Sequence, residues 1–370
     1  MSPPSFSDLA VAGVRSLKPY VPGKPVEELE RQYGVTNAIK LASNENPLGA
    51  SPKALAAIRD HLTQLERYPD DGAYALKNLL AKKHAVKPEQ ITLGNGSSNL
   101  LELSARVFVA PGQEVVFSQY SFLLYPIIVQ AIGAISVVAA AKNFGHDLDA
   151  ISAAINANTK LVFIANPNNP TGTWLTRAAL ERFFERVPPH VIIVMDEAYF
   201  EFGMALSLDD YADALLWLEK YPNIIVTRTF SKAFGLAGLR VGYAVSHPEV
   251  ADLLSRVRAP FNVNSLALIA AQAALGDHAH LSNTQDVNKN GLAQLTQELT
   301  QRGFAVIPSA ANFVCVDLLS NAAQVYEGLL REGVIVRPVA GLAQHLRITV
   351  GRPEENKRVI VALCKVTGRD

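Results

Sequence analysis

The sequence NIIVTRTFSKAFGLAGLRVG, residues 223–242, joins an apolar run to a segment of small residues that holds Lys232 and Arg240. Its first five residues, NIIVT, hold a run of β-branched and mostly apolar residues, which predicts a short buried strand. Lys232 follows this strand closely and is either an ordinary solvated charge or an amine kept in a site for chemistry. The neighbouring segments of the chain decide between the two interpretations.

Two further runs resemble the first. LVFIA at 161–165 and VIIVM at 191–195 are also short, apolar and rich in β-branched residues. Between them, TRAALERFFERV at 176–187 has apolar positions at three- and four-residue spacing, which is typical of an amphipathic helix. Buried strands that alternate with such helices predict an α/β fold with a mostly parallel sheet and helices on both faces.

The pattern changes after about residue 260. A long helical stretch is expected over 265–302, and short strands follow in FAVIP, NFVCVDL, VIVRPV and HLRITVG. These features predict a smaller α+β domain. We therefore expect an N-terminal arm at 1–50 that packs with the small domain or a partner subunit, a large cofactor-binding domain at 51–260 and a small domain at 261–370.

Composition argues against nucleic-acid and membrane partners. Lys plus Arg and Asp plus Glu number 34 each, so the formal net charge is zero and no basic surface is expected. The start of the chain lacks the pattern of a signal peptide, and the apolar stretch at 125–141 is interrupted by polar and helix-breaking residues, so no membrane span is expected. We expect a cytoplasmic protein.

Cysteine and histidine usage argues against a metal or a disulfide framework. Cys315 and Cys364 are the only cysteines, too few for either, and we expect both to be reduced. The eight histidines show no ligand spacing. His278 and His280 lie two apart in a segment expected to be a solvated loop, so we expect no metal.

Polar residues follow each of the three predicted strands. The strand at 161–165 leads into NPNNPTG at 166–172, which holds Asn169. The strand at 191–195 leads into Asp196, and the strand at 223–227 leads into Ser231 and Lys232. Each has an ordinary explanation alone, as a turn, a helix cap or a solvated charge. In open α/β sheets, however, ligands bind beyond the carboxyl ends of the strands, so three such groups together predict a site.

The segment GNGSSN at 94–99 precedes another helical run. Small residues that open a helix leave backbone N–H groups free to meet a phosphate, although Ser and Asn also favour helix caps. The spacing is not that of a dinucleotide-binding motif. An amine, a carboxylate, an amide, a serine–arginine pair and a phosphate cradle together suit pyridoxal 5'-phosphate, whose aldehyde forms a Schiff base with lysine and whose ring nitrogen a carboxylate keeps protonated.

These motifs also carry a family resemblance. SKAFGLAGLRVGY, NPNNPTG and MDEAY resemble the pyridoxal-phosphate-dependent transferases of fold type I. Within the class II subgroup, SLKPYVPGKP, LASNENPLG, RYPD, RTFSKAFGLAGLR and LRITVGRPEENKRVI are similar to histidinol-phosphate aminotransferases. The resemblance implies a large domain with a mostly parallel sheet flanked by helices, and a smaller α+β domain.

The resemblance also implies roles for individual residues. Lys232 would form the Schiff base and shuttle the proton, and Asp196 would pair with the ring nitrogen. Asn169 and Tyr199 would bind the phenolic oxygen, and Phe122 would stack on the ring. The cofactor phosphate would be held by Ser97, Ser98, Ser231 and Arg240, and by Tyr68 of the partner subunit in a homodimer. Substrate would be bound by Tyr20, Asn44, Tyr68, Arg337 and Arg347.

The implied reaction is ping-pong transamination of histidinol phosphate with 2-oxoglutarate, which gives imidazole acetol phosphate and glutamate in histidine biosynthesis. A bidentate arginine binds a phosphate and a carboxylate equally well, so the substrate stays open. The alternatives within the fold are an aromatic or broad-range aminotransferase and a threonine-phosphate decarboxylase. A non-catalytic cofactor sensor and an α/β binding protein without cofactor are the alternatives from other classes.

Overall fold

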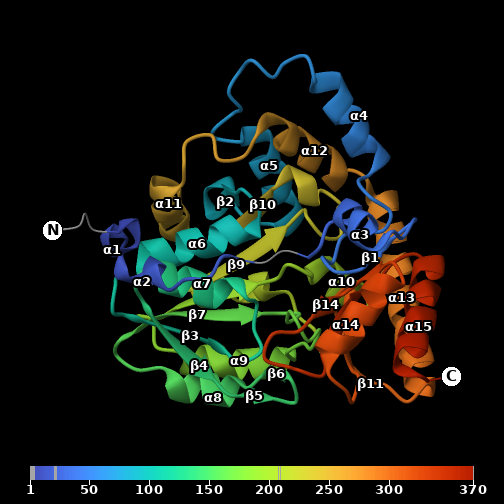
Figure 1. The fold of residues 1–370 in the computed structure, drawn as a ribbon. Coiled ribbons are helices and arrows are strands. Elements are labelled where there is room, and N and C mark those ends of the chain that lie inside the picture. The colour runs from blue at the N-terminus through green and yellow to red at the C-terminus, as the bar shows by residue number, and fades with distance from the viewer. Residues whose placement is uncertain (1–4, 21–22, 207, 209, 370) are drawn as a thin grey trace.

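The computed structural model describes residues 5–20, 23–206, 208 and 210–369. Its large sheet has seven strands, and a separate four-stranded sheet lies beside it with the C-terminal helices (Figure 1). In spatial order the large sheet consists of β2 (Ile91–Gly94), β10 (Gly242–Val245), β9 (Ile224–Thr229), β8 (Ile192–Asp196), β7 (Thr159–Ala165), β3 (Glu114–Ser118) and β4 (Ile135–Ala139). β10 runs antiparallel to both of its neighbours, β2 and β9, and the other pairs of this sheet are parallel. The predicted mostly parallel sheet is confirmed.

Helices cover both faces of this sheet because its strands are apolar on both sides. Along β7, Leu161 and Phe163 pack into one core, and Val162 and Ile164 pack into the other. The first core includes α6 (Ser97–Phe108), α7 (Leu124–Ala131) and α11 (Pro248–Val257). The second includes α4 (Pro52–His61), α5 (Tyr74–His84), α8 (Leu148–Ala154), α9 (Arg177–Arg186) and α12 (Ser265–Leu275).

The small domain is an antiparallel sheet backed by helices. Its strands are, in spatial order, β11 (Ala305–Ile307), β12 (Phe313–Asp317), β15 (His345–Thr349) and β14 (Arg337–Pro338). Helices α13 (His278–Gln301), α14 (Ala322–Arg331) and α15 (Pro353–Thr367) contribute the apolar residues that pack on it. The short strand β1 (Ile39–Lys40) pairs in parallel with β13 (Val334–Ile335), which joins the end of the N-terminal segment to this domain.

The helical stretch expected over 265–302 is two helices, and the expected loop at His278 and His280 is wrong. Helix α12 ends at Leu275 with Gly276 as its C-cap, and the Asp277 side chain accepts a hydrogen bond from the His280 N–H, so α13 starts at His278. The alanines of α12 pack against the large sheet. The domain boundary at residue 260 stays a prediction, and this packing favours a boundary after α12.

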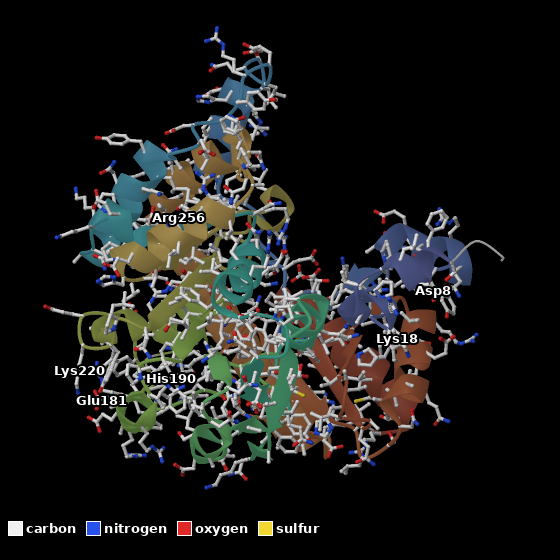
Figure 2. All side chains as sticks on the ribbon, turned by 90° about the vertical axis from the view of Figure 1, so that its left-hand side faces the viewer. Asp8, Lys18, Glu181, His190, Lys220 and Arg256 are labelled. Carbon is white, nitrogen blue, oxygen red and sulfur yellow. The ribbon has the colours of Figure 1, made fainter. Side chains whose placement is uncertain are left out.

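The N-terminal helices are α1 (Phe6–Leu9), α2 (Ala12–Arg15) and α3 (Val26–Tyr33). Of these, α2 packs on α7, where the Gln130 amide donates to the Gly13 carbonyl. In Figure 2 Asp8 of α1 and Lys220 lie at opposite edges of the molecule, and the segment between α4 and α5 projects from the top. The remaining elements are β5 (Ala141–Lys142), β6 (Gly145–His146), α10 (Phe200–Ala205) and the 3-10 turns Pro88–Gln90, Ala214–Trp217 and Ala237–Leu239.

The described residues hold neither a candidate membrane span nor a candidate metal-binding cluster. No described helix is both long and apolar enough to cross a bilayer. No group of three or more His, Cys, Asp or Glu residues in the described part could hold a metal ion. His190, for example, lies at the surface in the turn before β8 (Figure 2).

Candidate active site

The three strands that end in polar groups are neighbours in the sheet, and their ends meet at one cavity. Ala165 of β7, Asp196 of β8 and Thr227 of β9 are register partners. The cavity beyond them has a volume of about 170 Å³. Of the predicted site residues, those that line it are Tyr20, Asn44, Ser97, Ser98, Phe122, Asn169, Asp196, Tyr199, Ser231, Lys232, Arg240, Arg337 and Arg347. Tyr68 does not.

Lys232 lies in this cavity as a half-buried amine rather than a solvated charge. Its Nζ donates to the Ser43 carbonyl oxygen at 2.8 Å. Burial, followed by the nearby cations Arg347 and Arg240, lowers the pKa of Lys232 to about 7. A large fraction of this amine is therefore neutral near pH 7, which a nucleophile or a general base requires.

Asp196 is a buried carboxylate at the end of β8. Tyr125, fully buried on α7, donates its hydroxyl to Asp196 Oδ2 at 2.9 Å, and Thr227 Oγ1 lies 3.4 Å from Oδ1. Burial raises the pKa of Asp196 to about 6 against the opposing effect of these hydrogen bonds. Helix α10 begins after Tyr199, so Asp196 is not its cap. The carboxylate can instead pair with a cationic ligand group in the cavity.

Tyr199 connects the large domain to the N-terminal segment. Its hydroxyl oxygen accepts hydrogen bonds from the Asn44 amide at 2.8 Å and from the Asn169 amide at 3.2 Å. Asn44 is itself held by Thr349 Oγ1, which donates to its side-chain oxygen at 3.0 Å. The three side chains Tyr199, Asn44 and Asn169 thus form one polar wall of the cavity.

Arg347, on β15, crosses from the small domain to this wall. Its Nη1 donates to Asn169 Oδ1 at 2.6 Å and its Nη2 to the Ala42 carbonyl at 2.7 Å. Nε is buried and has no hydrogen-bond partner among the described residues. A second guanidinium, Arg337, lies 5.7 Å from the centre of the Tyr20 ring. The small-domain side of the cavity therefore carries two cations, which suits an anionic substrate group.

The opposite end of the cavity is a cradle for an anion. Helix α6 starts at Ser97, so Ser97 and Ser98 lie at the positive end of its dipole. Arg240 Nη1 donates to Ser231 Oγ at 3.2 Å. Gly96, with φ +81°, leaves the space beside this guanidinium, because a Cβ at that position would overlap Arg240 Nη2. This geometry fits a phosphate group.

A buried ion cluster supports the floor of the site. Arg228 on β9 is fully buried, and its Nη2 donates to Glu197 Oε2 at 2.6 Å and to Asp213 Oδ1 at 2.5 Å. Burial alone would lower the pKa of Arg228, but these carboxylates raise it, so the guanidinium stays charged. Glu197 directly follows Asp196, so the cluster fixes the chain where β8 ends.

Tyr68 was predicted to serve the partner subunit's site, and its place in this chain leaves that prediction open. Tyr68 is 81% exposed and stacks on Phe261 with ring centroids 4.5 Å apart, away from the cavity of this chain. Tyr125 and the Ser43 carbonyl are in direct contact with the two central groups of the site but were not predicted. The apolar sequence around Tyr125 gives no pattern that marks a buried phenol. The position of a backbone carbonyl cannot be predicted from the identity of its residue.

The residues present fit pyridoxal phosphate. A buried carboxylate, a low-pKa lysine, two amides with a phenol, and a helix N-terminus with a serine–arginine pair line one cavity. The Cβ-free space at Gly96 lies at the phosphate cradle, and the aromatic face of Phe122 lines the same cavity. These are the groups that the cofactor's ring nitrogen, aldehyde, phenolic oxygen and phosphate require.

Comparison with known proteins agrees with this fit. Residues 36–363 match the family model Aminotransferase class I and II. The chain is 56% identical to histidinol-phosphate aminotransferase 1 of Nitrosococcus oceani, over 97% of this chain and 96% of that protein. It is 57% identical to histidinol-phosphate aminotransferase 2 of Pseudomonas fluorescens, over 99% of both. The crystal structure of histidinol-phosphate aminotransferase from Sinorhizobium meliloti in complex with pyridoxal-5'-phosphate superposes with a TM-score of 0.89 at 31% identity, covering 97% of each chain.

Proposed function

The chain belongs to the class I and II aminotransferase family, and we propose that it transfers the amino group of histidinol phosphate to 2-oxoglutarate, giving imidazole acetol phosphate and glutamate. The proposed substrate is supported by the 50–57% identity to histidinol-phosphate aminotransferases over nearly the whole chain. The cofactor is pyridoxal 5'-phosphate, in agreement with the family and with the groups that line the cavity. The reaction is a step of histidine biosynthesis, for which we propose a cytoplasmic location.

Bound pyridoxal phosphate supplies an aldehyde that bonds covalently to amines and a ring that withdraws electrons from the substrate carbon. Ser97, Ser98, Ser231 and Arg240 would hold its phosphate, and Asp196 would hold its ring nitrogen in the protonated state. Asn169 and Tyr199 would bind the phenolic oxygen. Phe122 would lie against the ring face.

Lys232 is the residue that moves the proton in this proposal. With a pKa of about 7, its Nζ is neutral in a large fraction of molecules and can accept the proton from the substrate carbon that bears the amine. The Ser43 carbonyl, 2.8 Å away, orients Nζ through a hydrogen bond. Removing Lys232 therefore removes both the covalent anchor and the base.

The two arginines of the small domain would select the substrate's anionic end. Arg347 has an unused buried Nε, and Arg337 lies above Tyr20. Histidinol phosphate presents a phosphate to this end, whereas 2-oxoglutarate presents carboxylates. Both anions suit a planar guanidinium, so one site can serve both half-reactions.

The test is a donor panel with 2-oxoglutarate that separates the class from the substrate. Histidinol phosphate is compared with histidinol, which lacks only the phosphate, with phenylalanine, tyrosine and histidine, and with threonine phosphate. We expect kcat/KM to be highest for histidinol phosphate and to fall at least about a hundredfold for histidinol, because the phosphate contacts are charge-assisted. A preference for phenylalanine or tyrosine would show that the proposed substrate is wrong, although the enzyme would still be a transaminase. Carbon dioxide release from threonine phosphate would show that the enzyme is a decarboxylase and not a transaminase.

We also propose that the active unit is a homodimer in which Tyr68 completes the partner's site. The support is a group of exposed apolar side chains around the projecting segment between α4 and α5 (Figure 1): Leu62, Leu65, Tyr68, Tyr74 and Phe261. Such a group is typical of a protein–protein interface.

Hybrid dimers test this proposal. Lys232→Ala and Tyr68→Ala homodimers are each expected to be impaired, because each lacks one residue at both sites. In a mixed dimer, the Lys232 of one subunit meets the Tyr68 of the other, so one site is intact and activity rises on mixing. Activity that stays at the mean of the two homodimers, or a monomer by light scattering, would contradict the shared site.

A further inference from the structure

Tyr68 lies in the segment between α4 and α5, which projects from the subunit (Figure 2). Its ring stacks on that of Phe261, with the centroids 4.5 Å apart and an angle of 18° between the planes. Tyr68 is 81% exposed and Phe261 is 40% exposed, so the stack lies at the surface and does little for the core of its own subunit. A side chain that serves another subunit nevertheless needs a fixed direction, because a freely moving one loses conformational entropy when it binds.

Phe261 is held in an unusual backbone conformation. It lies in the turn between α11 and α12 with φ +54°, in the left-handed region that a bulky residue rarely adopts. Its N–H donates to Asp71 Oδ1 at 2.7 Å. A backbone conformation of this kind persists only where neighbouring groups fix it, and such residues gather at functional positions.

Asp71 is fixed in turn by Arg258, the C-cap residue of α11. Arg258 Nη1 donates to Oδ1 and Nη2 to Oδ2, each at 2.7 Å, and Nη2 also donates to the Asp71 carbonyl at 3.2 Å. These bonds, followed by that from the Phe261 N–H, lower the pKa of Asp71 to about 2, so the carboxylate is charged near pH 7. A two-point pair of this kind fixes the relative geometry of two segments that are 187 residues apart.

Asn262 connects the same pair to the sheet beside the anion cradle. Its side-chain oxygen accepts a hydrogen bond from Arg258 Nη1 at 3.3 Å, and its amide donates to the Leu93 carbonyl on β2 at 3.0 Å. Strand β2 ends at Gly94, and the cradle helix α6 starts at Ser97. The segment that carries Tyr68 is thus anchored to the large sheet and not only to another loop.

Given the homodimer proposed above, on which this step rests, we propose that Asp71 and Arg258 position Tyr68 for the site of the partner subunit. The Phe261 ring is the support that fixes the direction of the phenol. Neither Asp71 nor Arg258 lines the cavity of its own chain, so both act through Tyr68. A change of Asp71 in one subunit should therefore weaken cofactor binding in the other subunit only.

Heterodimers isolated through two different tags test this expectation, since only a subunit that keeps Lys232 binds pyridoxal phosphate covalently. The visible absorbance of the lysine-bound cofactor then reports the affinity of one site. In the first heterodimer, a Lys232→Ala subunit that also carries Asp71→Asn is paired with a wild-type subunit, so the intact site receives Tyr68 from the variant. In the second, Asp71→Asn lies on the subunit that keeps Lys232, and its site receives Tyr68 from a Lys232→Ala subunit with an intact Asp71–Arg258 pair.

The reference is the heterodimer of Lys232→Ala with the wild-type subunit. We expect pyridoxal phosphate to bind the first heterodimer about fivefold more weakly than the reference, the value of about one hydrogen bond, and to bind the second as tightly as the reference. Weakening in both, or in the second alone, would mean that Asp71 acts within its own subunit and would overturn the proposal. Unchanged affinity in both would overturn it as well.

Tyr68→Ala separates this proposal from that of the shared site. Placed on the Lys232→Ala subunit of the first arrangement, it should weaken binding at least about tenfold, the loss of one bond to a charged group. No effect there would refute the shared site, and with it the role of Asp71. With Tyr68→Ala present, Asp71→Asn on the same subunit should have no further effect, and an additive loss would show that Asp71 acts independently of Tyr68.

Two further variants in the first arrangement test the stack and the charge. Phe261→Leu keeps the N–H bond to Asp71 but removes the aromatic face, and should weaken binding about threefold; unchanged affinity would show that Tyr68 is held without the stack. Asp252→Asn, which breaks the exposed pair with Arg256 on α11, is the matched control and should leave the affinity unchanged. A loss equal to that of Asp71→Asn would show that charge, and not position, is responsible.

Discussion

Removing the Tyr125 hydroxyl tests whether this unpredicted residue sets the charge of Asp196. In Tyr125→Phe the ring can keep its stacking on Phe163, at 4.5 Å between centroids, and only the 2.9 Å hydrogen bond to Asp196 is lost. A hydrogen bond to a charged group contributes about 1.5–3 kcal/mol, and one pKa unit is about 1.4 kcal/mol. The pKa of Asp196 should therefore rise by about one to two units from its value of about 6.

In the cofactor-free protein, the raised pKa of Asp196 makes the free energy of unfolding depend on pH. Because the folded pKa of Asp196 lies above the unfolded value, its stabilising effect is present at low pH and is lost as the pH rises through about 6. In Tyr125→Phe this loss continues to higher pH. The difference in unfolding free energy between the two proteins should thus be larger at pH 8 than at pH 5, by about 1.5–3 kcal/mol.

Urea unfolding of cofactor-free protein at pH 5 and pH 8 measures this difference, and an absorbance titration at pH 8 measures the affinity for pyridoxal phosphate. We expect the affinity of Tyr125→Phe to fall by at most about twofold at pH 8, since a pKa raised by one to two units leaves half or more of the Asp196 carboxyl groups ionised. Phe117→Leu, a core change nearby that leaves Asp196 bonded, is the control and should lower stability equally at both pH values. A pH-independent loss in Tyr125→Phe would show that the hydroxyl acts only through packing.

Three further predictions concern the cradle, the lysine and the ion cluster. Gly96→Ala should displace Arg240 and weaken pyridoxal phosphate binding about tenfold by absorbance titration, the loss of one charge-assisted contact; unchanged affinity would exclude the cradle. Without cofactor, the folded protein releases the Lys232 proton near pH 7, whereas the unfolded protein releases it near pH 10.5. The free energy of unfolding measured in urea should therefore rise from pH 7 to pH 9, and Lys232→Met should abolish this rise. Glu197→Gln leaves the buried Arg228 with a weaker partner and should cost about 3 kcal/mol, whereas Glu185→Gln, in an exposed pair with Lys220, should change stability by less than about 0.5 kcal/mol.

The sequence predicted those features that depend on residues close together in the chain. The runs at 161–165, 191–195 and 223–227 became neighbouring strands because segments rich in apolar and β-branched residues on both sides are stable inside a sheet covered on both faces. The polar residues after them converge because parallel strands end at the same edge. The break at Gly276 was missed because the helical period continues on both sides of it.

Contacts between distant segments could not be predicted in this way. Tyr125 and Asp196 are 71 residues apart, and nothing in the apolar sequence around Tyr125 distinguishes its hydroxyl from a solvated one. Asn169 and Arg347 are 178 residues apart; Asn169 lies in the loop after β7 of the large sheet, and Arg347 lies on β15 of the small one. Such pairs depend on how α7 and the small domain pack on the large sheet, which local periodicity does not encode. Family resemblance supplied the second pair's site roles but not their contact.

That contact between Asn169 and Arg347 gives the cavity a means to respond to its substrate. Arg347 donates one hydrogen bond to the Asn169 side-chain oxygen and another to the Ala42 carbonyl, and the Asn169 amide donates to the Tyr199 hydroxyl. A substrate phosphate or carboxylate that binds Arg347 in a bidentate manner must compete with at least one of these neutral acceptors, and a charged acceptor wins. Substrate binding would then release the Asn169 side-chain oxygen, which links the small domain to the wall of the cofactor site. Arg347→Lys, which keeps the charge but cannot bridge both acceptors, should therefore weaken substrate binding more than cofactor binding, and an equal loss of both would show that the arginine serves only to join the domains.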